Sequence, residues 1–70
     1  MNKTKGRYYG IGLKGGDAYT GYIREPEVLD RLRDAPPGEW VWYNDTDGTI
    51  WIRAGEVQSI FIGREGYEPN

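Results

Sequence analysis

The sequence predicts a mainly β domain of the α+β kind, with the element order β-β-α-β-β-β. Three observations carry this prediction. Two runs of strand-forming residues flank residues 14–17, three further runs lie within residues 40–62, and one helical segment separates the two groups. Seventy residues suffice for one small core, so we treat residues 1–70 as a single small β-rich domain.

The first two strands are expected at residues 7–13 and 18–23, joined through Lys14-Gly15-Gly16-Asp17. Gly-Gly supplies the positive φ angles of a two-residue primed turn, and in that register Lys14 faces Asp17. Successive residues of a strand point to opposite faces. The register therefore sorts the side chains into two sets: Tyr9, Ile11, Leu13, Ala18, Thr20 and Tyr22 on one face, and Tyr8, Gly10, Gly12, Tyr19, Gly21 and Ile23 on the other. Three glycines on one face indicate a bend that closes a small barrel, or a close approach by another group.

A short helix is expected at about residues 26–35. Pro26 lies in its first turn, where the missing N–H does no harm. Val28, Leu29 and Leu32 share one face, which predicts the side of the helix that packs on a sheet. The run Pro36-Pro37-Gly38 ends the helix.

The second hairpin is the clearest signal in the chain. Its strands are expected near residues 40–44 and 49–53, joined through Asp45-Thr46-Asp47-Gly48, in which Asp-Gly is a strong turn signal. A two-residue loop and a four-residue loop give the same partition of side chains. Val41, Tyr43, Ile50 and Ile52 then lie on one face, and the opposite face holds Trp40, Trp42, Trp51 and Arg53.

The last strand is expected at residues 57–62, after a turn at Ala54-Gly55. Residues 40–62 would then form three antiparallel strands of one sheet, joined by two tight turns. Five short strands and one short helix fit an SH3-like or Sm-like small barrel, or a curved antiparallel sheet with the helix on one face. The polar residues 1–6 and 64–70 are expected to be flexible tails.

The composition disfavours several classes of function. The chain has no cysteine and no histidine, so it lacks thiolate metal ligands, thiol nucleophiles, disulfides and the commonest general base near neutral pH. A net charge of −2 opposes the approach of a long nucleic acid or an anionic membrane surface. No apolar run is long enough to cross a bilayer. We therefore expect a cytoplasmic protein that is not an enzyme and that needs no cofactor.

Two motifs resemble ligand sites but lack the context that such sites need. Residues 10–15 have the spacing G-x-G-x-x-G, yet they lead into another strand rather than into a helix that could hold a pyrophosphate. Residues 45–48 resemble the middle of a calcium loop, but Tyr43 and Ala54 stand where the first and last ligands belong. No pair of carboxylates is placed by its spacing in an apolar pocket, so the sequence predicts neither a metal site nor acid–base catalysis.

The three tryptophans lie on the face of the second hairpin that the expected core does not use. Three covers for this face are possible. A barrel could close around it, a second copy of the chain could cover it and so stabilise a small domain, or a ligand or partner could bind there.

The sequence thus predicts a non-catalytic binding protein that acts as a small homo-oligomer. Its aromatic and arginine surface would engage a partner protein or sequester a planar, nucleotide-like ligand. The alternative is a small barrel that recognises single-stranded nucleic acid by stacking. The candidate binding residues are Trp40, Trp42, Trp51, Arg53, Tyr19, Tyr22, Arg24 and Lys14.

Overall fold

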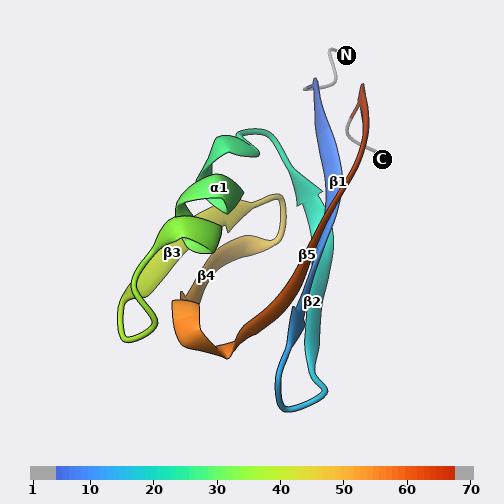
Figure 1. The fold of residues 1–70 in the computed structure, drawn as a ribbon. Helices are drawn as coiled ribbons and strands as arrows, with labels where there is room; N and C mark the ends of the chain where they lie inside the picture. Colours follow the sequence, from blue (N-terminus) through green and yellow to red (C-terminus); the bar gives the residue numbers. More distant parts are fainter. Residues whose placement is uncertain (1–4, 68–70) are drawn as a thin grey trace.

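The computed structural model describes residues 5–67, and its element order confirms the predicted β-β-α-β-β-β arrangement (Figure 1). The elements are β1 (Lys5–Leu13), β2 (Ala18–Ile23), α1 (Glu27–Asp34), β3 (Trp40–Asp45), β4 (Gly48–Arg53), the 3₁₀ turn η1 (Ala54–Glu56) and β5 (Val57–Tyr67). Among the described residues, no helix has the length and apolar character needed to cross a membrane.

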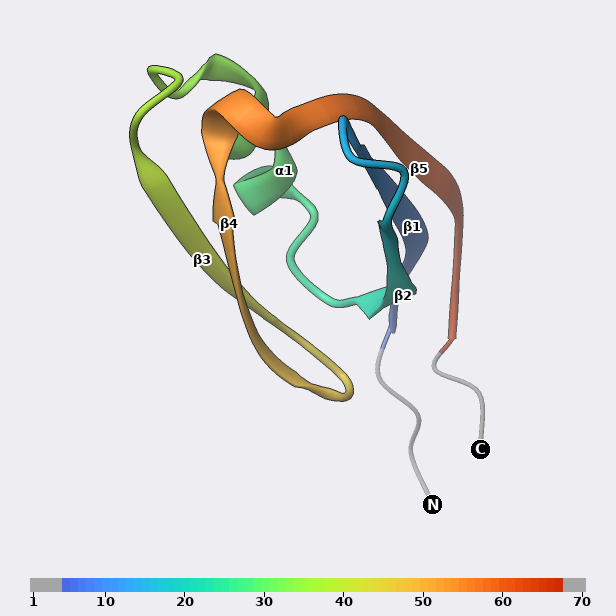
Figure 2. The ribbon, with the colours of Figure 1, turned by 90° about the horizontal axis from the view of Figure 1, so that it is seen from below.

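The strands form two antiparallel sheets. One has three strands in the order β2-β1-β5, and the other is the two-stranded hairpin β3-β4. Figure 2 shows the hairpin facing the three-stranded sheet, with α1 between them at one end. Because the two sheets do not join within residues 5–67, the predicted SH3-like or Sm-like barrel is wrong. The mainly β class and the single helix are confirmed.

The last strand pairs with β1, so the expected three-stranded sheet of residues 40–62 is also wrong. The cause lies in η1, which turns the chain away from β4. The Gly55 N–H donates to the Pro37 carbonyl at 2.8 Å, and the Lys14 N–H donates to the Glu56 carbonyl at 2.9 Å. These two bonds hold η1 between the helix–β3 connection and the first hairpin, and β5 then runs along β1.

Pairing with each other extends β1 and β5 beyond the strand ends that the sequence predicted. Its register extends from Leu13 opposite Val57 to Lys5 opposite Tyr67. Residues 5–6 and 64–67, expected in flexible tails, are therefore strand residues. The rest of the expected tails, residues 1–4 and 68–70, lie outside the described residues.

The first hairpin has a three-residue loop rather than the predicted two-residue turn. The Leu13 N–H donates to the Asp17 carbonyl at 2.8 Å, and the Gly16 N–H donates to the Leu13 carbonyl at 3.0 Å. Gly16 has a φ of 97°, which is the left-handed conformation that such a loop requires at its third position. Lys14 therefore does not face Asp17.

An odd loop length changes which β2 side chains share a face with those of β1. Gly21 and Tyr19 pair with Tyr9 and Ile11, whereas Tyr22 pairs with Tyr8. The predicted sorting of this hairpin is consequently wrong for β2. The predicted sorting of the second hairpin is confirmed, because Asp45 pairs with Gly48 around a two-residue loop.

The core lies between the two sheets and α1. Its buried residues come from every layer, and those of the helix are the expected Leu29 and Leu32. The others in this cluster are Tyr9, Ile11, Ile23, Val41, Tyr43 and Ile52. The face of β3-β4 that carries Val41, Tyr43 and Ile52 thus points into the core, and its opposite face points to solvent.

Candidate binding surface

The exposed face of the β3-β4 hairpin carries the three tryptophans and Arg53, and we call these four residues the tryptophan surface. The ladder between β3 and β4 sets their positions, with Trp40 opposite Arg53 and Trp42 opposite Trp51. The exposed fractions of Trp40, Trp42 and Trp51 are 57%, 50% and 58%. The interpretation of these rings as the core of a barrel is therefore wrong, and the other two covers considered, a second copy and a ligand or partner, stay predictions.

The exposed indole area is large for so small a domain. Three half-exposed tryptophans present roughly 300–400 Å² of mostly apolar surface. Patches of about 300–600 Å² are the largest on a typical monomeric protein and are often functional. The tryptophan surface thus has the size of the largest apolar patch on a typical monomeric protein.

Trp42 and Trp51 are in contact across the hairpin. Their ring centroids lie 6.2 Å apart, and the ring planes are tilted by 38°. A third ring inserted between two others needs a separation of roughly 7 Å, twice the carbon–carbon contact distance. The two indoles therefore leave no slot between them, and a planar ligand would have to lie on their outer faces.

Two arginines flank Trp40. Arg53 is its cross-strand neighbour, and Arg31 of α1 lines a hollow of about 180 Å³ together with Glu39, Trp40 and Trp42. Neither Arg31 nor Arg53 forms an ion pair with another residue of the described range 5–67. The surroundings of Trp40 therefore hold two guanidinium groups that can meet a negative charge from outside the chain.

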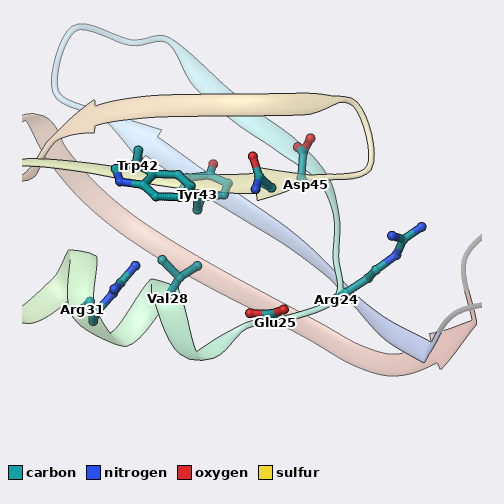
Figure 3. A pocket seen from close by; sticks show the side chains of 8 residues that line it. Arg24, Glu25, Val28, Arg31, Trp42, Tyr43 and Asp45 are labelled. Carbon is teal, nitrogen blue, oxygen red and sulfur yellow. The ribbon is translucent and has the colours of Figure 1, made fainter.

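A second hollow, of about 340 Å³, lies between β3 and the segment that leads from β2 into α1. Figure 3 shows Val28 and Arg31 projecting from α1 toward β3, with Glu25 and Arg24 farther along the same side. Trp42, Tyr43, Asn44 and Asp45 line the β3 side of the hollow. Arg31 and Trp42 line both hollows, so the two hollows are neighbours along β3.

Asp45 has a structural task at the end of this second hollow. Its Oδ1 accepts hydrogen bonds from the backbone N–H groups of Asp47 at 2.8 Å and Gly48 at 3.1 Å, and its Oδ2 accepts one from the Tyr9 hydroxyl at 2.7 Å. The turn at residues 45–48 resembles part of a calcium loop, but the Asp45 carboxylate binds backbone N–H groups of its own turn. Among the described residues, no group of three or more carboxylates is placed to hold a metal ion.

The buried hydroxyls of Tyr9 and Tyr43 also belong to the fold. The Tyr43 hydroxyl donates to the Tyr9 hydroxyl at 2.9 Å. Burial raises the pKa of Tyr43 to about 12, and burial together with the bond to Tyr43 raises the pKa of Tyr9 further. Both side chains therefore stay protonated near neutral pH and are unsuited to serve as bases.

The structure separates the other predicted site residues. Tyr22 is buried, and its hydroxyl donates to the Gly66 carbonyl at 2.6 Å. Tyr19 is 40% exposed on β2, and Lys14 lies in the first hairpin loop. Arg24 lines the larger hollow, so only five of the eight predicted residues lie on or beside one surface: Trp40, Trp42, Trp51, Arg53 and Arg24.

The candidate binding residues chosen from the sequence did not include Arg31, Val28 and Asn44, which line the larger hollow. Val28 and Arg31 are three residues apart on α1 and so lie on one side of the helix, at the rim of the buried stripe that Leu29 and Leu32 form. That spacing could have marked Arg31 as a residue beside the packed face of α1 rather than on its far side. Only the docking of α1 beside β3, however, determines which strand it faces.

No protein family model, no curated protein and no solved structure matches this chain.

Proposed function

We propose that the protein is a non-catalytic, cytoplasmic binding protein whose tryptophan surface engages a partner protein. One observation carries the proposal: three indoles, each at least half exposed, lie together on the hairpin face that the core does not use. Tryptophan and arginine are the residues most often found at the energetic centres of protein interfaces. A chain without cysteine is suited to the reducing cytoplasm.

The charges around the tryptophan surface favour a partner segment with an acidic residue. Arg31 and Arg53 have no acidic partner within residues 5–67, and both lie beside Trp40. A carboxylate that meets a guanidinium group makes charge-assisted hydrogen bonds, which are stronger than neutral ones. Glu25 and Glu39 lie in the larger and the smaller hollow, respectively, so a single acidic residue near Arg31 fits better than a run of them.

A planar nucleotide-like ligand, or a single strand of nucleic acid, is the competing occupant. The outer indole faces and the two arginines support it, because bases stack on both kinds of group. The net charge of −2 and the absence of a slot between Trp42 and Trp51 weigh against it. We therefore place it second.

Calorimetric titration with short peptides tests the proposal. The probe is a peptide of the same length as β3, six residues, in which valine and threonine alternate and one central position is glutamate; the matched peptide has lysine there. We expect the glutamate peptide to bind and the lysine peptide to bind at least about tenfold more weakly. Trp51→Ala and Arg53→Glu should each reduce the affinity for the glutamate peptide by a similar factor.

Phe61→Ala is the control that shows whether the loss of an exposed aromatic ring elsewhere on the molecule also weakens peptide binding. Phe61 is 65% exposed but lies on β5, in the other sheet, and its replacement should leave the peptide affinity unchanged. Equal binding of both peptides, or a Trp51→Ala variant that binds as well as the parent protein, would contradict the proposal. Tight binding of an oligothymidylate with a steep loss on adding salt, and none of either peptide, would favour the nucleic acid alternative.

A further inference from the structure

The outer edge of β3 is unpaired where the two hollows lie. The β3-β4 sheet has only two strands, so the edge of β3 that faces away from β4 meets no other strand of residues 5–67 between Trp40 and Asn44. Beyond Asn44, the Thr46 N–H donates to the Tyr22 carbonyl at 3.1 Å, which brings the hairpin turn against the end of β2. The edge is therefore closed at its turn end and open along the rest of the strand.

The ladder determines which backbone groups lie on this open edge. In an antiparallel pair, alternate residues exchange hydrogen bonds with the partner strand, and the residues between them direct their N–H and C=O groups outward. The Ala54 N–H donates to the Glu39 carbonyl at 2.9 Å, so the odd-numbered residues of β3 are the ones bonded to β4. Trp40, Trp42 and Asn44 consequently point their N–H and C=O groups away from β4, at a spacing of about 7 Å.

The space beside this edge is a groove with α1 on its other side. The hollows of about 340 and 180 Å³ share Arg31 and Trp42 and so follow one another along β3. Figure 3 shows Val28 and Arg31 directed from α1 toward the strand across the larger hollow. An open edge with a helix alongside it is the arrangement in which a protein accepts an extended peptide as an additional strand.

We infer that the partner segment binds in an extended conformation, as an added strand on the open edge of β3. This inference rests on the proposed function and gives the form of the ligand: an extended peptide with an acidic residue near its centre. Trp40, Trp42 and Asn44 supply the backbone hydrogen bonds. Alternate side chains of the bound peptide point to opposite faces of the sheet. One set lies beside Trp42 on the exposed face, and the other set lies over Val28. The central carboxylate of the peptide lies near Arg31.

Peptides methylated on the backbone nitrogen test the inference. In an added strand, only alternate N–H groups face β3, and the others face solvent. Two versions of the glutamate peptide are needed, one methylated at the odd positions and one at the even positions. We expect one version to lose more than about tenfold in affinity and the other to stay within about twofold of the parent peptide. Equal effects of the two methylations would overturn the inference.

A pair of proline variants makes the same test on the protein. Asn44→Pro removes an N–H on the open edge of β3, where proline is tolerated because the ladder does not use that group. Thr49→Pro is the control, because Thr49 lies opposite Asn44 and points its N–H to the far edge of β4. Both variants lose the same 2.6 Å hydrogen bond, which the Thr49 hydroxyl donates to Asn44 Oδ1. Asn44→Pro should abolish peptide binding and Thr49→Pro should retain it, with the amide spectrum of each variant showing that it is folded.

The outcomes separate this inference from the proposed function. If the glutamate peptide binds and Trp51→Ala weakens it, but methylation and Asn44→Pro do not, the tryptophan surface binds its partner without strand addition and the inference fails alone. If no peptide binds, the proposed function fails as well. Protection of the Trp42 and Asn44 amides from exchange on concentrating the protein alone would assign the edge to a second copy, and would overturn the inference. Should Asn44→Pro not fold, the methylated peptides still decide.

Discussion

Tyr9 and Asp45 lie on different sheets, and the 2.7 Å hydrogen bond from the Tyr9 hydroxyl to Oδ2 of Asp45 joins them. Tyr43 extends this link by donating to Tyr9 at 2.9 Å, and the two rings meet edge to face with centroids 5.6 Å apart. The hydroxyls are buried, so each depends on the others for its hydrogen bonds. The three side chains therefore fix the hairpin that carries the tryptophan surface against the three-stranded sheet.

Removing the Tyr9 hydroxyl should cost more stability than removing that of Tyr43. Tyr9→Phe deletes both the acceptor for Tyr43 and the donor to Asp45, and we expect a loss of about 1–3 kcal/mol in the free energy of unfolding. Tyr43→Phe deletes one bond and leaves Tyr9 bonded to Asp45, so its cost should be about 0.5–1.5 kcal/mol. Urea unfolding followed by circular dichroism measures both. A larger loss for Tyr43→Phe would show that the link to Asp45 contributes little.

The same pair of tyrosines should make the protein sensitive to alkaline pH. Burial raises the pKa of Tyr43 from about 10 to about 12 in the folded state, and that of Tyr9 is raised as well. Above about pH 10 the unfolded chain releases these protons while the folded chain keeps them, so the free energy of unfolding decreases as the pH rises toward 12. Below about pH 10 the stabilisation is complete. Urea unfolding at a series of pH values should show this decrease.

The control for the alkaline effect is the double variant Tyr9→Phe/Tyr43→Phe. It keeps the exposed Tyr8 and Tyr19 but lacks the two buried hydroxyls, so its stability should change less between about pH 10 and about pH 12. An equally steep decrease in the double variant would assign the effect to other groups.

Gly21 gives Asp45 the room to reach Tyr9. A Cβ at Gly21 would lie 2.8 Å from Asp45 Oδ2 and 3.3 Å from the Tyr9 ring. Gly21→Ala should therefore displace the carboxylate and cost about 1–3 kcal/mol of stability. Gly10→Ala is the matched control: it also adds a methyl group to a strand of the same sheet, but its nearest neighbour would be the Thr20 methyl at 3.7 Å. Its effect should stay within about 0.5 kcal/mol, and equal losses in the two variants would refute the steric explanation.

The two hairpins show how far the sequence alone determines a register. At Asp45–Gly48 the two turn lengths considered place the same residues on each face, so the sequence alone predicts that the three tryptophans share one face of the hairpin, but not that this face is exposed. At Lys14–Asp17 the Gly15-Gly16 pair permits both a two-residue and a three-residue loop, and these give opposite sortings. In the structure only Gly16 of this pair has a positive φ, and the three-residue loop and its register follow from that. The residues of the turn do not themselves determine which of the two glycines adopts this conformation.

Long-range contacts account for the other differences. Residues 57–62 are apolar on both faces, a pattern that suits pairing with β4 as well as with β1. The bonds from Gly55 to Pro37 and from Lys14 to Glu56 decide between the two, and each joins segments distant in sequence. Arg31 was missed for a similar reason, because the strand that it faces depends on how α1 packs.

Trp51 and Ile52 are adjacent in β4 but point to opposite faces, and their replacements should differ accordingly. Ile52 is 3% exposed and Trp51 58%. Ile52→Ala should cost about 2–5 kcal/mol because it leaves a cavity in the core. Trp51→Ala should cost less than about 1.5 kcal/mol, the scale of its aromatic contact with Trp42. Chemical unfolding of both variants checks this, and an unfolded Trp51→Ala protein would mean that the tryptophan surface belongs to the core.

The homo-oligomer that the sequence predicts should form only weakly and reversibly if the tryptophan surface is its interface. The indole area of roughly 300–400 Å² per copy is well below the about 800 Å² per partner of a standard stable interface. We therefore expect sedimentation velocity to show monomers at micromolar concentration and dimers or larger species only toward millimolar concentration. Trp51→Ala should abolish these species, whereas Phe61→Ala should retain them because Phe61 lies on the other sheet. A stable oligomer at micromolar concentration that survives Trp51→Ala would place the self-association elsewhere on the molecule.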